Sequence, residues 1–215
     1  MIPSFKSSTR PTISAFALND LPDHYDLMLR GESILEQSQI HATDIVELQK
    51  LVHENGIPDY PIIFCKLAYM RGCVYLEGNF SYPLMFLDSS KANSNELLCE
   101  TYIHEAAHLL SNGQDHDFAF AVVYNSFRLM VGLNLSDNDY DYRACDFDEL
   151  SMDATKELCS ICAKILLETC PNVPFVKKVE AMSFSLSIIS TCYQPANIPD
   201  VLKKNVEVVS RNLEN

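Results

Sequence analysis

Apolar residues recur every three or four positions over most of this 215-residue chain, and they alternate or run together only in a short part before its middle. The first pattern is typical of helices that bury one face, and the second is typical of β-strands. In the first predicted helix, Ile45, Leu48 and Val52 share one face, and Gly56 and Pro58 end the helix. The pattern predicts helices over residues 44–55, 95–111, 117–131, 151–169 and 199–212, and strands over residues 62–69, 72–76 and 82–87.

Residues 175–193 fit two structures. Met182, Leu186 and Ile189 have helical spacing, whereas residues 183–187 alternate between serine and apolar side chains as in a strand. The length of the segment favours a helix, because strands are usually about four to eight residues long.

The predicted elements form one α+β domain that spans residues 1–215. No internal repeat, low-complexity tract or linker divides the sequence. Residues 1–40 have little periodicity and are expected to form a poorly defined N-terminal segment. From about residue 135 onward we expect a helical C-terminal extension of the same domain.

Acidic residues outnumber basic ones and limit the classes of partner. The chain has 29 Asp and Glu against 16 Lys and Arg, a formal charge of −13. This charge repels a phosphate backbone and argues against a nucleic-acid partner. No apolar run approaches the roughly 20 residues that a membrane-spanning helix needs. Nothing in the pattern indicates an oligomeric state.

The N-terminus and the cysteines suggest a cellular location. The apolar patch at residues 13–18 is too short for a signal peptide. The eight cysteines lie mostly among apolar residues, as free thiols do in a reducing compartment. We therefore expect a cytoplasmic protein. The alternative is that the Ser/Thr-rich start is an address for a specialised bacterial secretion system.

One motif carries chemistry. Within the predicted helix 95–111 the chain reads His104-Glu105-Ala106-Ala107-His108. Residues four apart lie one above the other on a helix, so His104 and His108 can direct their imidazoles at one metal ion. Glu105 lies beside them and can reach a water on that metal without being a ligand.

A catalytic zinc site usually has three protein ligands and an open position. We favour His116 as the third ligand, because Gly113 lets the chain leave the first helix and turn back, so that His116 opens the next helix. Three carboxylates remain alternatives for this position: Asp115, Asp117 and Glu149.

This segment resembles the zincin metallopeptidases, and within them it is most similar to the SprT-like and YgjP-like proteins. The resemblance covers roughly residues 82–127 and lies in the His-Glu-x-x-His motif, the bend, and His116 followed four residues later by Phe120. It implies a zincin-like fold in which a small, mostly antiparallel sheet packs on the motif helix. It also implies that residues 82–87 form an edge strand along which a substrate peptide pairs. The alternative for this strand is an internal position.

The chain departs from these families at two places. It has His116-Asp117-Phe118 where the group often has His-Gly-Pro. It also lacks the two cysteine pairs of the zinc ribbon found in SprT-like proteins that act on DNA-bound substrates. Its only close pair, Cys159 and Cys162, lies in the apolar stripe of a predicted helix and is expected to be structural.

The resemblance implies a zinc-dependent metallopeptidase that hydrolyses peptide bonds in a protein or peptide substrate. His104, His108 and His116 would hold Zn²⁺, and Glu105 would be the general base. Two alternatives stay open. One is a catalytically inactive binding protein on a zincin scaffold, and the other is a secreted bacterial effector protease that acts on one host protein.

Peptide hydrolysis also needs a second group, besides the metal, that stabilises the negative charge developing on the carbonyl oxygen. Four residues qualify by chemical type alone, and the sequence does not select among them: Tyr124, Tyr140, Tyr142 and Arg143.

Overall fold

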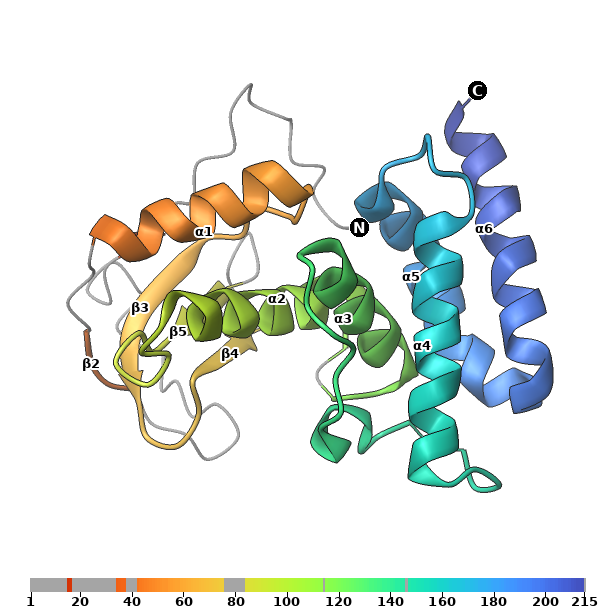
Figure 1. Ribbon diagram of the computed structural model, residues 1–215, viewed down its shortest axis with the longest axis horizontal. Coiled ribbons are helices and arrows are strands. Elements are labelled where there is room, and N and C mark those ends of the chain that lie inside the picture. The colour runs from red at the N-terminus through yellow and green to blue at the C-terminus, as the bar shows by residue number, and fades with distance from the viewer. Residues whose placement is uncertain are drawn as a thin grey trace. The chain divides into compact units, whose positions relative to one another are not determined.

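The computed structural model of the protein describes residues 15–16, 34–37, 42–75, 84–113, 115–145 and 147–214 (Figure 1). Most of the N-terminal segment and the first two residues of the predicted strand 82–87 lie outside this set. The helices are α1 (Ala42–Asn55), α2 (Asn95–Ser111), α3 (Phe118–Met130), α4 (Met152–Glu168), α5 (Phe175–Cys192) and α6 (Ile198–Glu214). The strands are β1 (Ala15–Phe16), β2 (Ile34–Gln37), β3 (Ile62–Leu67), β4 (Gly72–Tyr75) and β5 (Leu84–Leu87).

The mixed α+β character is confirmed, and each predicted helix is present with ends that differ by at most two residues. The ambiguous segment 175–193 is the helix α5. The chain divides into two compact units, residues 1–106 and 107–215, and the boundary falls within α2. A single domain stays a prediction, and each unit is described by itself.

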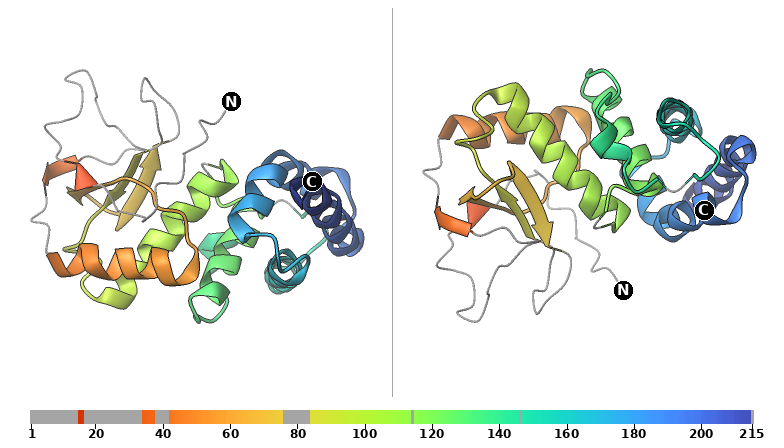
Figure 2. Two further views of the ribbon diagram at one scale, coloured as in Figure 1. Left: turned by 90° about the horizontal axis from the view of Figure 1, so that it is seen from above. Right: turned by 90° about the horizontal axis from the view of Figure 1, so that it is seen from below.

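The sheet of the N-terminal unit has the strand order β1-β3-β5-β4. Strand β3 pairs in parallel with β5, with Ile62 opposite Met85, and β5 pairs in antiparallel fashion with β4. Strand β3 also pairs with β1 in parallel and with β2 in antiparallel fashion. Figure 2 shows α1 and α2 on the same side of these strands.

Two expectations about this sheet are wrong. The sheet is not mostly antiparallel, because the pairs β1–β3 and β3–β5 are parallel. The strand near residues 82–87 is not an edge strand, because β5 lies between β3 and β4. The chain passes from β3 to the outer position of β4 and only then returns to the place beside β3. Met85, Phe86 and Leu87 are all 0% exposed, as in a strand that is covered on both faces.

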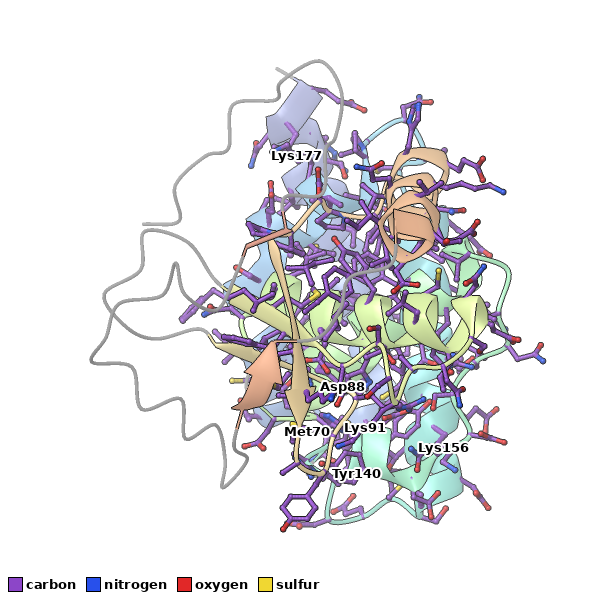
Figure 3. All side chains as sticks on the ribbon, turned by 90° about the vertical axis from the view of Figure 1, so that its left-hand side faces the viewer. Met70, Asp88, Lys91, Tyr140, Lys156 and Lys177 are labelled. Atoms are coloured by element: carbon purple, nitrogen blue, oxygen red, sulfur yellow. The ribbon has the colours of Figure 1, made fainter. Side chains whose placement is uncertain are left out.

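A buried carboxylate joins the turn after β3 to the turn after β5. Asp88 is 1% exposed, and its Oδ2 accepts a hydrogen bond of 2.9 Å from the Leu67 amide. Its Oδ1 accepts bonds from the amide and hydroxyl of Ser90. The neighbouring Lys91 donates to the carbonyl groups of Leu67 and Met70 (Figure 3). These bonds fix the backbone at the start of the segment that leads into α2.

The C-terminal unit is built around α3. Every residue from Phe118 to Phe127 is buried, so α3 is covered on all sides. Helices α4 and α5 pack on α3, and α6 packs on α4 and α5. Lys178 of α5 is 1% exposed and donates a 2.8 Å hydrogen bond to the carbonyl of Thr169 at the end of α4. Burial lowers the pKa of this lysine.

All eight cysteines are free thiols, as expected. Cys159 and Cys162 are both 0% exposed on the inner face of α4, and burial raises the pKa of Cys162 to about 12. A protonated, buried thiol is a poor metal ligand, which agrees with the structural role expected for this pair. None of the described helices is long and apolar enough to span a bilayer.

Candidate metal centre

The motif helix α2 carries three titratable residues in its otherwise buried second half. Ile103, Ala106 and Ala107 are 0% exposed. Among them His108 is 4% exposed and Glu105 is 5% exposed, while His104 is half-buried. Burying an imidazole or a carboxylate costs free energy unless it has a partner, so these side chains require polar contacts inside the protein.

The chain reverses direction directly after this helix. Asn112 has a φ of 56°, in the left-handed region, and the amide of Gly113 donates to the carbonyl of His108 over 3.2 Å. The bend expected at Gly113 is therefore made largely by Asn112, a residue that tolerates this conformation. In return, Nδ1 of His108 lies 3.0 Å from the carbonyl oxygen of Gly113. Because that oxygen only accepts, Nδ1 carries the hydrogen, and Nε2 carries the lone pair through which a neutral imidazole binds a metal.

His116 lies just before α3, and its orientation is fixed in the same way. Its Nδ1 donates a 2.7 Å hydrogen bond to the carbonyl of Tyr140, in the short 3-10 helix η2 (Asp139–Tyr142). The next residue, Asp117, caps α3 by accepting a 2.8 Å bond from the amide of Phe120. Burial raises the pKa of the Asp117 carboxyl, although the amides of Phe120 and Ala119 oppose this shift.

Phe120 holds the two imidazoles at a set distance. Its ring stacks on His108 with centroids 4.1 Å apart and on His116 with centroids 4.4 Å apart. The two imidazole centroids are 4.9 Å apart. The aromatic residue four positions after His116 is therefore a contact of both His108 and His116.

The structure brings His104, His108 and His116 together. One ligand nitrogen from each lies within 4.8 Å of the others, and this is the only such group of potential metal ligands in the part of the chain that the structure describes. The three histidines could hold a metal ion. Asp115, Asp117 and Glu149, the alternatives for the third ligand, are not members of the group.

No protein-family model, no curated protein and no solved structure matches this chain. The zincin interpretation therefore depends on the residues and on their geometry.

The donor set fits a transition metal of the zinc type. Neutral imidazoles suit zinc, copper, iron and nickel, whereas calcium and magnesium prefer oxygen ligands. Three histidines leave a fourth tetrahedral position open, as in catalytic zinc sites. A buried Nδ1–H bond to a carbonyl group behind the ligand is also typical of histidines that bind metal.

The general base predicted from the sequence lies against the edge of the sheet. A Cβ atom added at Gly72, the first residue of β4, would lie only 2.9 Å from both Cγ and Oε1 of Glu105 and 2.8 Å from Thr101 Cγ2. Only glycine therefore lets β4 approach α2 this closely at the level of Glu105. Since β4 is the outer strand at this end of the described sheet, it replaces residues 82–87 as the strand beside the site.

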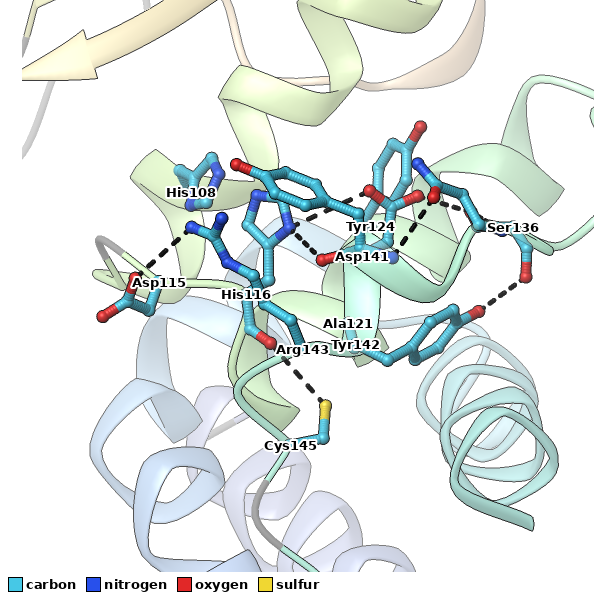
Figure 4. A network of polar contacts seen from close by, with 12 residues as sticks. His108, Asp115, His116, Ala121, Tyr124, Ser136, Asp141, Tyr142, Arg143 and Cys145 are labelled. Carbon is cyan, nitrogen blue, oxygen red and sulfur yellow. Dashed lines mark hydrogen bonds and ion pairs between the residues drawn. The ribbon is translucent and has the colours of Figure 1, made fainter. Parts of the chain in front are cut away.

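Sequence reasoning missed a carboxylate behind His116. Oδ1 of Asp141 is 3.9 Å from Nδ1 of His116, and the residue is 5% exposed (Figure 4). Its Oδ2 accepts a 2.5 Å hydrogen bond from the hydroxyl of Ser136. This carboxylate adds negative charge behind a ligand, which makes the imidazole a better electron donor to a metal.

The substitution Asp141→Asn tests this contribution. It keeps the shape of the side chain but removes the charge, so we expect the affinity for zinc to fall about tenfold. The affinity is measured by competition with a fluorescent chelator. Asp148→Asn is the matched control, because it makes the same charge change at an exposed residue in the same acidic segment. Equal affinities for the two variants would contradict a role for Asp141.

Proposed function

We propose that the protein is a zinc-dependent metallopeptidase in which His104, His108 and His116 bind the metal and Glu105 is the general base. The observation that carries the proposal is the convergence of three histidine nitrogens within 4.8 Å of one another, with a buried glutamate next to one of them on the same helix. The chemistry that zinc supplies in such a site is activation of a water molecule and polarisation of a carbonyl group.

Glu105 has the position that a general base requires. It is next to a proposed ligand in the chain but is not part of the histidine group, as expected of a proton acceptor that does not itself bind the metal. It takes a proton from the attacking water and delivers it to the leaving amine. Its near-complete burial keeps most bulk water away from this carboxylate.

The substrate would bind as an extended peptide along β4. In the described sheet this strand pairs with β5 and stands at the end of the strand order, which is the position from which a sheet is extended by an added strand. The close approach of Gly72 to Glu105 would put the paired peptide next to the general base. Backbone pairing of this kind gives affinity for many sequences, which suits a peptidase.

The first test is the metal content of the purified protein. We expect about one zinc per chain in the wild type and almost none in His108→Ala, because two histidines alone bind zinc weakly. His53→Ala is the control, since this histidine is exposed on α1. Wild-type protein that neither contains zinc nor takes it up when it is added would overturn the proposal.

The second test separates a peptidase from an inactive binding protein. Glu105→Gln keeps the size of the side chain but cannot accept the proton, so we expect zinc to stay bound and cleavage of fluorescein-labelled casein to fall by about a hundredfold or more. Glu96→Gln, at an exposed position of the same helix, is expected to cleave at the wild-type rate. If zinc is present and the wild type cleaves no peptide bond in casein or in a mixed peptide library, the inactive binding protein is favoured.

The third test concerns the close approach of β4. Gly72→Ala places a methyl group against Glu105, so we expect the catalytic rate to fall at least tenfold while the zinc content is unchanged. Overpacking should also reduce the free energy of unfolding by about 1–3 kcal/mol. The control is Gly132→Ala, where φ is 78° but no atom lies within 4 Å, so that backbone strain occurs without a clash. A loss of stability in both variants with a normal rate in both would exclude the steric effect on Glu105.

A further inference from the structure

Peptide hydrolysis places negative charge on the carbonyl oxygen, and a donor aimed at that oxygen speeds the reaction. Tyr124, Tyr140, Tyr142 and Arg143 have suitable chemistry, and the structure now distinguishes them. The inference below rests on the proposed peptidase function and names a further residue of the same site.

Two of the tyrosines are buried, and their hydroxyl groups make hydrogen bonds within the protein. Tyr142 is 2% exposed, and its hydroxyl donates a 2.8 Å hydrogen bond to the carbonyl of Ser136. Tyr124 is 3% exposed, and its hydroxyl accepts a 2.9 Å bond from Arg128. Both side chains are part of the buried interior and cannot turn toward a substrate without breaking these bonds.

Tyr140 has the opposite arrangement. Its backbone carbonyl accepts the Nδ1 hydrogen of His116, and its ring meets the His116 ring edge-on with centroids 4.7 Å apart. It is 50% exposed. Within the part of the chain that the structure describes, the Tyr140 hydroxyl makes no hydrogen bond. The side chain is thus beside a proposed metal ligand while its donor is available.

Arg143 restrains the Tyr140 ring. The guanidinium carbon lies 4.1 Å from the ring centroid, and Nη2 is 3.5 Å from a carboxylate oxygen of Asp115. A cation over the face of an aromatic ring is attracted electrostatically to the ring. The guanidinium, already paired with Asp115 and placed over the ring, is better suited to positioning Tyr140 than to contacting the substrate.

We propose that Tyr140 is a catalytic residue that donates its phenolic hydrogen bond to the substrate carbonyl oxygen as negative charge develops there. The phenol keeps its proton, so no bond to Tyr140 forms or breaks. Arg143 is a positioning residue that limits the motion of the ring. The T-shaped contact holds the Tyr140 ring against the ring of His116, a proposed metal ligand.

The decisive variant is Tyr140→Phe, which removes only the hydroxyl. Loss of one such donor typically costs about a hundredfold in the catalytic rate. We therefore expect kcat to fall by about tenfold to a hundredfold, KM to change less than threefold, and zinc content and melting temperature to equal those of the wild type. Tyr193→Phe makes the same change at a tyrosine of similar exposure, 47%, that belongs to no part of the proposed site.

A binding measurement gives a readout apart from turnover. A phosphinic peptide mimics the charged tetrahedral state, so calorimetry on the zinc-loaded protein should show at least tenfold weaker binding by Tyr140→Phe and no change for Tyr193→Phe. Arg143→Met keeps the hydroxyl but removes the cation, and we expect a smaller loss of about threefold to tenfold in kcat.

The outcomes separate this inference from the proposed function. If Glu105→Gln is inactive while Tyr140→Phe matches the wild type in kcat and in phosphinate affinity, the peptidase stands and the role of Tyr140 is wrong. If the zinc protein cleaves nothing but Tyr140→Phe still weakens phosphinate binding, the peptidase is wrong and Tyr140 is a ligand-binding residue. If the wild type binds neither zinc nor phosphinate, both proposals fall.

Discussion

The candidate site depends on two hydrogen bonds from imidazole Nδ1 atoms to backbone carbonyl groups. His108 donates to the carbonyl of Gly113 and His116 donates to that of Tyr140, over 3.0 and 2.7 Å. Each bond fixes both the tautomer and the direction of its ring, so that each Nε2 atom carries the lone pair that would bind a common ion. The acceptors are backbone atoms, and their positions are set by the turn after α2 and by η2.

The helical C-terminal unit supplies the rigidity that this arrangement needs. Phe120 contacts both imidazoles and belongs to α3, whose residues are buried from Phe118 to Phe127. The segment that carries Tyr140 and Asp141 is joined to α3 through Tyr142, whose hydroxyl accepts a bond from the Asn125 amide. Helix α3 and the short helix η2 are thus a support for the third histidine and its carbonyl acceptor.

Much of this arrangement could be predicted from the sequence, for identifiable reasons. Helix ends were predictable because apolar spacing and residues such as Gly56 and Pro58 are local signals. The order of the strands was not predictable in this way, because strand pairing depends on contacts between residues far apart in the sequence. The continuous apolar run of β5 is nevertheless typical of an internal strand. The spacing of the three histidines along the chain indicates that they can meet, because it places two on one helix face and the third after a bend. No such spacing points to Asp141, because it lies beside His116 only as a result of the path that the chain takes after α3.

The turn between α2 and α3 has a consequence for how this protein can diverge. The carbonyl group that orients His108 belongs to Gly113, five residues further along the chain, and His116 follows three residues after Gly113. An added or deleted residue between Asn112 and His116 would displace the acceptor of one imidazole and change the direction of the other in a single step. Since the acceptor is a backbone atom, its position depends on the number of residues in the turn and on the left-handed conformation of Asn112, rather than on a side chain at position 113. In a lineage of such proteins we therefore expect the length of the turn to be kept, together with a residue at position 112 that tolerates a positive φ.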